Sequence, residues 1–157
     1  MSTDIFTWLA DSRLGFWVTS SPFIWPTLEC IHFVSLCVLM GSLLIIDLRL
    51  IGFYRERCGP MIALLIRLSL LAFAVNLSTG LLFFAGNTYK YVGNPAFEIK
   101  LVLILAAGIN ALVYRFRLSH LVESEDVSWE SIGAGYLSLA LWSGVIVCGR
   151  MITFYAI

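Results

Sequence analysis

Four long apolar segments constrain the fold of this chain more than any other feature of its sequence. They cover residues 23–46, 61–85, 97–114 and 132–155, and each is close to the ~20 residues that a helix needs to cross a bilayer. The segments show little of the 3.6-residue alternation that a surface helix of a soluble protein requires. Hydrophobic residues make up 60% of the chain. The sequence therefore predicts an integral membrane protein.

The connections between the four segments are short and carry turn residues. They read YRERCGP, GNTYKYVGNPAF and RFRLSHLVESEDVSWES. Because short connections place sequential helices antiparallel, we expect one all-α domain over residues 1–157, an up-down-up-down four-helix bundle. Trp8, Phe16 and their apolar neighbours further predict a short interfacial helix before the first span, capped near residues 2–4.

The basic residues predict the orientation of the bundle. Six arginines lie on the side of the first and third connections: Arg49, Arg55, Arg57, Arg67, Arg115 and Arg117. Four basic residues lie on the opposite side: Arg13, Lys90, Lys100 and Arg150. The positive-inside rule therefore places the first and third connections in the cytoplasm. In the inner membrane of a Gram-negative bacterium, both termini would be periplasmic.

Charge and motif content exclude several classes of function. The formal net charge is zero, with ten basic and ten acidic residues, so no electrostatic basis for nucleic-acid binding exists. The four cysteines have no CxxC spacing and predict neither a zinc site nor a thioredoxin-type site. No phosphate loop, HExxH motif or catalytic triad is recognisable. The sequence indicates no enzyme class.

Ionisable residues inside membrane spans are costly and need either a partner or a function. On the outer side of the predicted bundle four such residues fall at one level: Glu29, His32, Lys100 and Arg150. Glu29 and His32 are three positions apart and share a helix face. The cluster predicts either a stabilising network with a packing histidine or a binding site in which His32 holds a ligand or a metal.

Haem b and a quinone are the two ligands that this cluster suits. His32 can ligate haem iron while Lys100 and Arg150 pair with the propionates. The second axial ligand is not evident, because His120 is predicted on the other side of the membrane; Met151 or a second subunit remains as a source. A quinone fits equally, with His32 donating to a carbonyl and Glu29 taking protons. A di-iron site is rejected because the carboxylates it requires are missing.

The remaining polar and small residues have structural interpretations. We expect Asp47 and Arg67 to form an ion pair between helices, and Asn76 and Asn110 to form interhelical hydrogen bonds. The last span carries small residues that permit close helix approach, within the chain, in a homo-oligomer or in a larger membrane complex. These residues are Gly133, Ser138, Gly144 and Gly149.

The segments ECIHFVSLCVLMGSLLIIDLRLIG, NPAFEIKLVLILAAGINAL and GVIVCGRMI resemble a family of small bacterial four-helix membrane proteins of unknown function. They are also distantly similar to the membrane domain of CopD-type copper-resistance proteins. The resemblance implies a four-helix fold and an inner-membrane location, but no activity. Family members often carry a further histidine at the end of the third span, where this chain has Tyr114 and Arg115, and this difference weakens the haem interpretation. The recurrent positions of the family correspond to His32, Gly41, Asp47, Arg49, Asn94, Pro95, Phe97, Lys100, Asn110, Gly149 and Arg150.

Three functional hypotheses follow. The first is a redox-associated membrane protein that binds haem b or a quinone at the outer cluster. The second is a non-enzymatic structural or accessory subunit of a membrane complex, in which the cluster only joins helices. The third, a copper or small-solute permease, is the weakest, because the soft Cys, Met and His ligands do not line one path.

Overall fold

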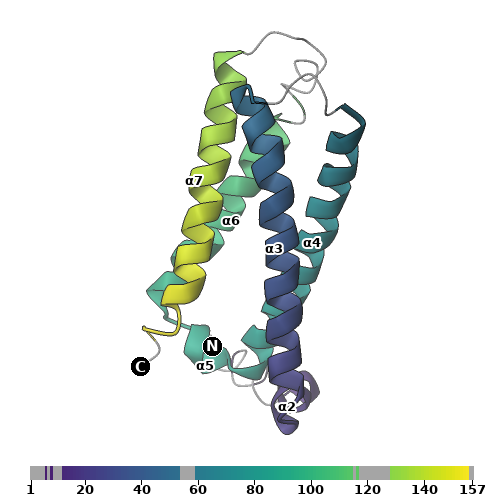
Figure 1. The fold of residues 1–157 in the computed structure, drawn as a ribbon. Coiled ribbons are helices and arrows are strands. Elements are labelled where there is room, and N and C mark those ends of the chain that lie inside the picture. Colours follow the sequence, from purple (N-terminus) through teal and green to yellow (C-terminus); the bar gives the residue numbers. More distant parts are fainter. Residues whose placement is uncertain are drawn as a thin grey trace.

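Four long helices form a bundle in the computed structural model, which describes residues 6, 8, 12–53, 59–114, 116 and 128–155. The long helices run side by side and alternate in direction along the chain (Figure 1). No strand occurs among the described residues, so the predicted all-α, up-down-up-down bundle is confirmed. The elements in chain order are α2 (Arg13–Ser20), α3 (Ile24–Ile51), α4 (Gly59–Gly86), α5 (Thr88–Tyr91), α6 (Pro95–Val113) and α7 (Trp129–Met151).

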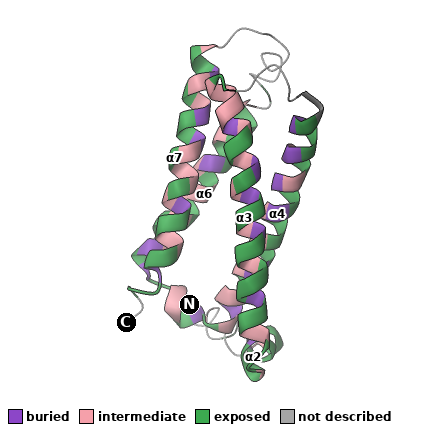
Figure 2. Ribbon diagram, viewed as in Figure 1, coloured by how far each residue is buried: buried purple, intermediate pink, exposed green. Residues whose placement is uncertain are grey.

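The outward surface of the bundle is apolar. In the described part of the chain four helices, α3, α4, α6 and α7, are long and apolar enough to cross a membrane. Exposed positions cover the outside of the bundle, while buried positions follow the lines where helices meet (Figure 2). Large side chains such as Leu71 and Leu105 point outward and remain more than 60% exposed. This surface is suited to acyl chains rather than water, so the chain is an integral, multi-pass membrane protein.

Helix ends follow local capping chemistry. The first span reaches Ile51 instead of residue 46, because the chain stays helical until Gly52 takes a left-handed conformation with φ 113°. The Phe53 N–H then donates to the Leu48 carbonyl at 2.9 Å, which closes the helix. At the start of α6 the Asn94 side chain accepts from the backbone N–H groups of Ala96 and Phe97, with Pro95 in the first turn.

The predicted short N-terminal helix is present as α2. It begins after Ser12, whose hydroxyl accepts from the Gly15 N–H at 3.1 Å; the cap predicted near residues 2–4 lies outside the described residues. Val18 is fully buried. A Cβ at Gly86 of α4 would stand only 2.8 Å from Val18 Cγ1 and 3.2 Å from the Trp25 ring. Helix α2 therefore packs across the ends of α3 and α4.

The bundle consists of two helix pairs joined at one end. Helix α3 packs on α4, α6 packs on α7, and α3 also contacts α7. One hydrogen bond between the two pairs runs from the Ser131 hydroxyl of α7 to the Leu50 carbonyl of α3, at 2.8 Å. Toward the opposite end, α3 and α7 separate (Figure 1). We call the end with α2 and α5 the outer end, following the predicted orientation, and the end with Leu50 the inner end.

Candidate functional site

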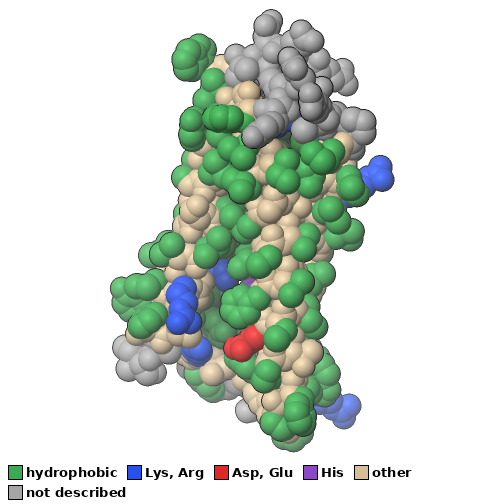
Figure 3. All heavy atoms as spheres, viewed as in Figure 1, with side chains coloured by type: hydrophobic (Ala, Val, Ile, Leu, Met, Phe, Trp, Pro, Cys, Tyr) green, Lys and Arg blue, Asp and Glu red, His purple; other side chains and the backbone are tan. Residues whose placement is uncertain are grey.

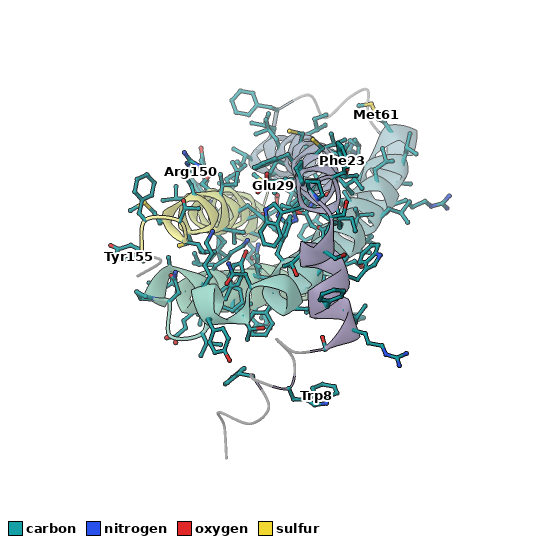
Figure 4. All side chains as sticks on the ribbon, turned by 90° about the horizontal axis from the view of Figure 1, so that it is seen from below. Trp8, Phe23, Glu29, Met61, Arg150 and Tyr155 are labelled. Carbon is teal, nitrogen blue, oxygen red and sulfur yellow. The ribbon has the colours of Figure 1, made fainter. Side chains whose placement is uncertain are left out.

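The predicted cluster lies at the outer end of the bundle, and its members differ in burial. His32 on α3 and Lys100 on α6 are half-buried, whereas Glu29 on α3 and Arg150 on α7 are exposed. Figure 3 shows the surface hollowed between α3 and α7, with acidic, basic and imidazole side chains around the hollow. Figure 4, seen from the outer end, places Glu29 and Arg150 on neighbouring helices. The structure thus brings the four residues to one end of the bundle.

His32 is held by a hydroxyl of the neighbouring helix. Its Nδ1 lies 2.7 Å from the Thr79 Oγ1 of α4. The same hydroxyl is within donating distance of two backbone carbonyls of its own helix, Val75 at 2.9 Å and Asn76 at 3.1 Å. In the tautomer with the ring proton on Nδ1, His32 donates to Thr79 and the hydroxyl donates to one of these carbonyls. In the neutral ring Nε2 then carries a free lone pair.

A second set of hydrogen bonds fixes the same stretch of α3 against α4. The Asn76 amide donates to the Ser35 hydroxyl at 2.6 Å, and that hydroxyl donates to the His32 carbonyl at 3.0 Å. Asn76 is therefore an interhelical hydrogen-bonding residue, as the sequence predicted. Bonds of this kind contribute about 0.6 kcal/mol each. Together they fix the position of the His32 backbone while Thr79 orients its ring.

Lys100 has no hydrogen-bond or ion-pair partner among the described residues. Its Nζ lies 3.5 Å from the position that a Cβ at Gly149 of α7 would occupy. A larger residue at Gly149 would therefore crowd the ammonium group. The Lys100 charge lies within electrostatic range of the His32 ring and of the Cys148 thiol. Lys100 is thus a half-buried cation without a partner among the described residues, within electrostatic range of the His32 ring.

The expected carboxylate–cation pairs do not form at the outer end. The Glu29 carboxylate instead accepts from the Trp25 indole N–H, one turn earlier in α3, at 2.9 Å. The Arg150 guanidinium lies over the Phe154 ring, 5.8 Å from its centroid. No ion pair joins described residues of this cluster, so its two cations and its carboxylate are not neutralised by one another. The described residues of the cluster therefore do not form an ion-pair network that joins the helices.

Aromatic rings pack between α4 and α6 at the outer end. The rings of Phe84 and Phe97 stack with centroids 5.6 Å apart, and Tyr91 of α5 meets Phe97 edge-on at 5.2 Å. Burial raises the pKa of the Tyr91 phenol, and the negative charge of Glu29 raises this pKa further. The aromatic rings therefore belong to the same electrostatic environment as Glu29.

Sequence reasoning missed two members of this site, Thr79 and Tyr91. Thr79 follows Asn76 by three positions in α4, so both side chains are directed to the same neighbour. That spacing could have identified Thr79 as a partner for a polar residue on α3. Tyr91 lies in a connection, and its burial depends on how α5 folds back over α6. No sequence pattern indicates that arrangement.

No family model, curated protein or solved structure matches this chain. The resemblance to small bacterial four-helix proteins therefore stays a prediction. The functional assignment rests on the chemistry of the site. His120, the second histidine of the chain, lies outside the described residues. Within them no group of three His, Cys, Asp or Glu side chains is placed to hold a metal ion.

The prediction of an Asp47–Arg67 ion pair is wrong. Asp47 is buried against α7, where the Ser138 hydroxyl faces its carboxylate, whereas Arg67 on α4 is exposed. The two helices are rotated so that these side chains face different neighbours. Asn110 of α6 does form its predicted interhelical bond, donating to the Ala134 carbonyl of α7 at 3.1 Å.

Proposed function

We propose that this chain is a redox-associated membrane protein that binds a quinol or quinone headgroup at the outer-end hollow. We place it in a bacterial inner membrane, with both termini in the periplasm. The observation that carries the proposal is the contact of His32 Nδ1 with the Thr79 hydroxyl, at 2.7 Å. In the tautomer with the proton on Nδ1, this contact leaves Nε2 as a free acceptor within electrostatic range of the partnerless Lys100 ammonium.

A quinol suits this pair of groups. One hydroxyl donates to the free Nε2 of His32, while Lys100 donates to the oxygen at the other end of the ring. When the hydroxyl loses its proton, His32 takes it up. Glu29, exposed three positions earlier on the same helix, is the next acceptor toward the periplasm. The hollow between α3 and α7 on the surface of the bundle (Figure 3) would let an apolar tail extend into the lipid.

Haem b is the second candidate ligand, because Nε2 of His32 could also coordinate the haem iron. Haem-ligating histidines donate their other ring N–H to a fixed acceptor, and the Thr79 hydroxyl, 2.7 Å from His32 Nδ1, is placed to be such an acceptor. Lys100 and Arg150 are the cations that would pair with the propionates. No second axial histidine is found among the described residues, and Met151 is exposed at the end of α7. A haem bound here would supply one-electron chemistry with His32 as its single ligand from the described part of the chain.

The test is the content of the protein purified in mild detergent. We expect extractable quinone, or a Soret band if the ligand is haem, and we expect its loss in His32→Ala, which removes Nε2. Glu98→Gln, an exposed acid in the first turn of α6, is the control and should retain the ligand. A colourless protein without quinone, which also fails to bind an added quinol analogue, would favour the structural-subunit hypothesis instead.

Thr79→Val is expected to weaken ligand binding about tenfold without abolishing it, because it removes the acceptor that orients His32 and keeps the side-chain volume. The measurement is titration of the purified variant with a quinol analogue. Thr27→Val, which removes an exposed hydroxyl bonded to its own helix at Phe23, is the matched control and should bind as the wild type does. Equal affinity of the two variants would mean that Thr79 does not orient the ring.

A further inference from the structure

The inner end of the bundle contains a buried carboxylate that the outer-end site does not use. Asp47 on α3 is 3% exposed. The Ser138 hydroxyl of α7 faces this carboxylate and favours its charged form. One carboxylate oxygen, Oδ2, is buried and has no hydrogen-bond partner among the described residues. A buried acid group therefore has an oxygen whose hydrogen-bonding capacity is not met by the described residues.

No cation of the described chain neutralises Asp47. The nearest basic residue in sequence is Arg49, whose buried Nη1 has no hydrogen-bond partner, so this nitrogen does not bond to the unpartnered Oδ2 of Asp47. Arg67, the cation expected to pair with Asp47, is exposed on α4. An ionised carboxylate buried without a partner is strongly unfavourable. The negative charge of Asp47 therefore needs a neutralising cation other than Arg49 or Arg67.

Helix α7 packs closely against α3 around Asp47, with the Ser138 hydroxyl facing the carboxylate. Ser131, Gly135 and Ser138 are all buried and lie four and three positions apart, on one face of α7. A Cβ at Gly135 would stand 3.0 Å from the Asp47 carbonyl oxygen, so the two backbones approach closely here. Carboxylate, hydroxyl and carbonyl oxygens are the ligands preferred by small, hard cations.

We propose that Asp47 is a monovalent-cation site within the membrane, which binds a proton or a sodium ion at Oδ2, with Ser138 as the neighbouring oxygen ligand. The two cations share one chemistry, the neutralisation of a buried carboxylate. The site lies at the other end of the bundle from His32 and involves neither quinol nor haem. Its failure or success is therefore independent of the outer-end function.

Two measurements on the full-length protein in detergent distinguish the cations. For sodium, thermal unfolding is followed while sodium chloride replaces choline chloride at constant ionic strength. We expect Tm to rise by roughly 3 °C or more at saturation, and we expect Asp47→Asn to abolish the rise. For a proton, the infrared spectrum at pH 7 should contain the C=O band of a protonated carboxylic acid, shifted in D₂O and lost in Asp47→Asn.

Control variants keep the test decisive. Glu98→Gln removes an exposed acid and should change neither measurement. If Asp47→Asn does not fold, Ser138→Ala serves in its place, because it keeps the carboxylate and removes only the neighbouring hydroxyl. It should reduce the sodium effect or shift the infrared band. A protein with no sodium-dependent Tm and no carboxylic-acid band sensitive to these variants would overturn the proposal.

Discussion

Gly135→Leu is expected to separate α7 from α3 at the inner end and to lower the stability of the bundle by about 3 kcal/mol. Even a single Cβ at this position would stand 2.9 Å from Ile51 Cγ1 and 3.0 Å from the Asp47 carbonyl oxygen. The carbonyl belongs to a helical backbone and cannot turn aside as a flexible side chain does. The helices must therefore move apart, and the Ser131–Leu50 hydrogen bond is lost with the contact.

The chain offers a matched control two residues away. Gly133 lies on the same helix, is exposed, and has nothing within 4 Å of the position that a Cβ would occupy. Gly133→Leu should therefore have little effect on stability. Unfolding of both variants in mixed detergent micelles measures the difference. Equal stability of the two variants would contradict the close α3–α7 contact at Gly135.

Asn94→Ala is expected to have the second large effect, a loss of about 2 to 4 kcal/mol. Asn94 is only 4% exposed. Its side-chain oxygen accepts from the Ala96 and Phe97 N–H groups at the start of α6. Its amide donates to the Ile152 carbonyl after α7, at 3.1 Å. The substitution thus removes a helix cap and leaves a buried carbonyl of another helix unsatisfied.

Asn87→Ala is the appropriate comparison for Asn94→Ala. Asn87 precedes the short helix α5 but makes no capping bond with its side chain, and it is exposed. Its removal should leave stability nearly unchanged. Thermal unfolding of the two variants in the same detergent is the measurement. A comparable loss in both would mean that Asn94 acts through general loop effects instead of its cap and its bond to Ile152.

The four spans were predictable because span length and hydropathy report directly on the width of the bilayer. The first and last residues of these helices were less predictable, because each helix end depends on the conformation or hydrogen bonds of a single capping residue. The first span continues to Ile51 because it stops only where Gly52 takes a positive φ. Asn94 followed by Pro95 could have placed the start of α6 from sequence, because this pair is a common N-terminal combination.

The candidate site was predictable as a set of residues but not as a set of contacts. Depth along a helix follows from counting residues, so Glu29, His32 and Lys100 were correctly expected at one end. The rotation of each helix about its axis is set by packing, and these spans are too uniformly apolar to reveal it. His32 therefore bonds to Thr79 instead of a charged residue.

The Asp47 prediction was wrong for the same reason. A carboxylate on α3 and a guanidinium on α4 lie at similar depths, and sequence alone cannot distinguish a lipid-facing Arg67 from one that faces α3. Long arginine side chains near a span end reach the headgroups without a protein partner. In the structure the Asp47 carboxylate faces the neutral hydroxyl of Ser138 instead of the Arg67 guanidinium.

The burial of Val18 against Gly86 means that the two helix pairs of the bundle, α3–α4 and α6–α7, are supported differently at the outer end. Helix α2 packs against the outer ends of α3 and α4 and exposes aromatic side chains, Phe16 and Trp17, of the kind that are enriched at membrane–water interfaces. The α6–α7 half meets α3 at the inner end through the Ser131–Leu50 hydrogen bond, and it meets α4 at the outer end through the stacked rings of Phe84 and Phe97. A movement of α7 away from α3 at the outer end would therefore pivot about the inner contact and about these rings, and it would change the distance between Lys100 and His32.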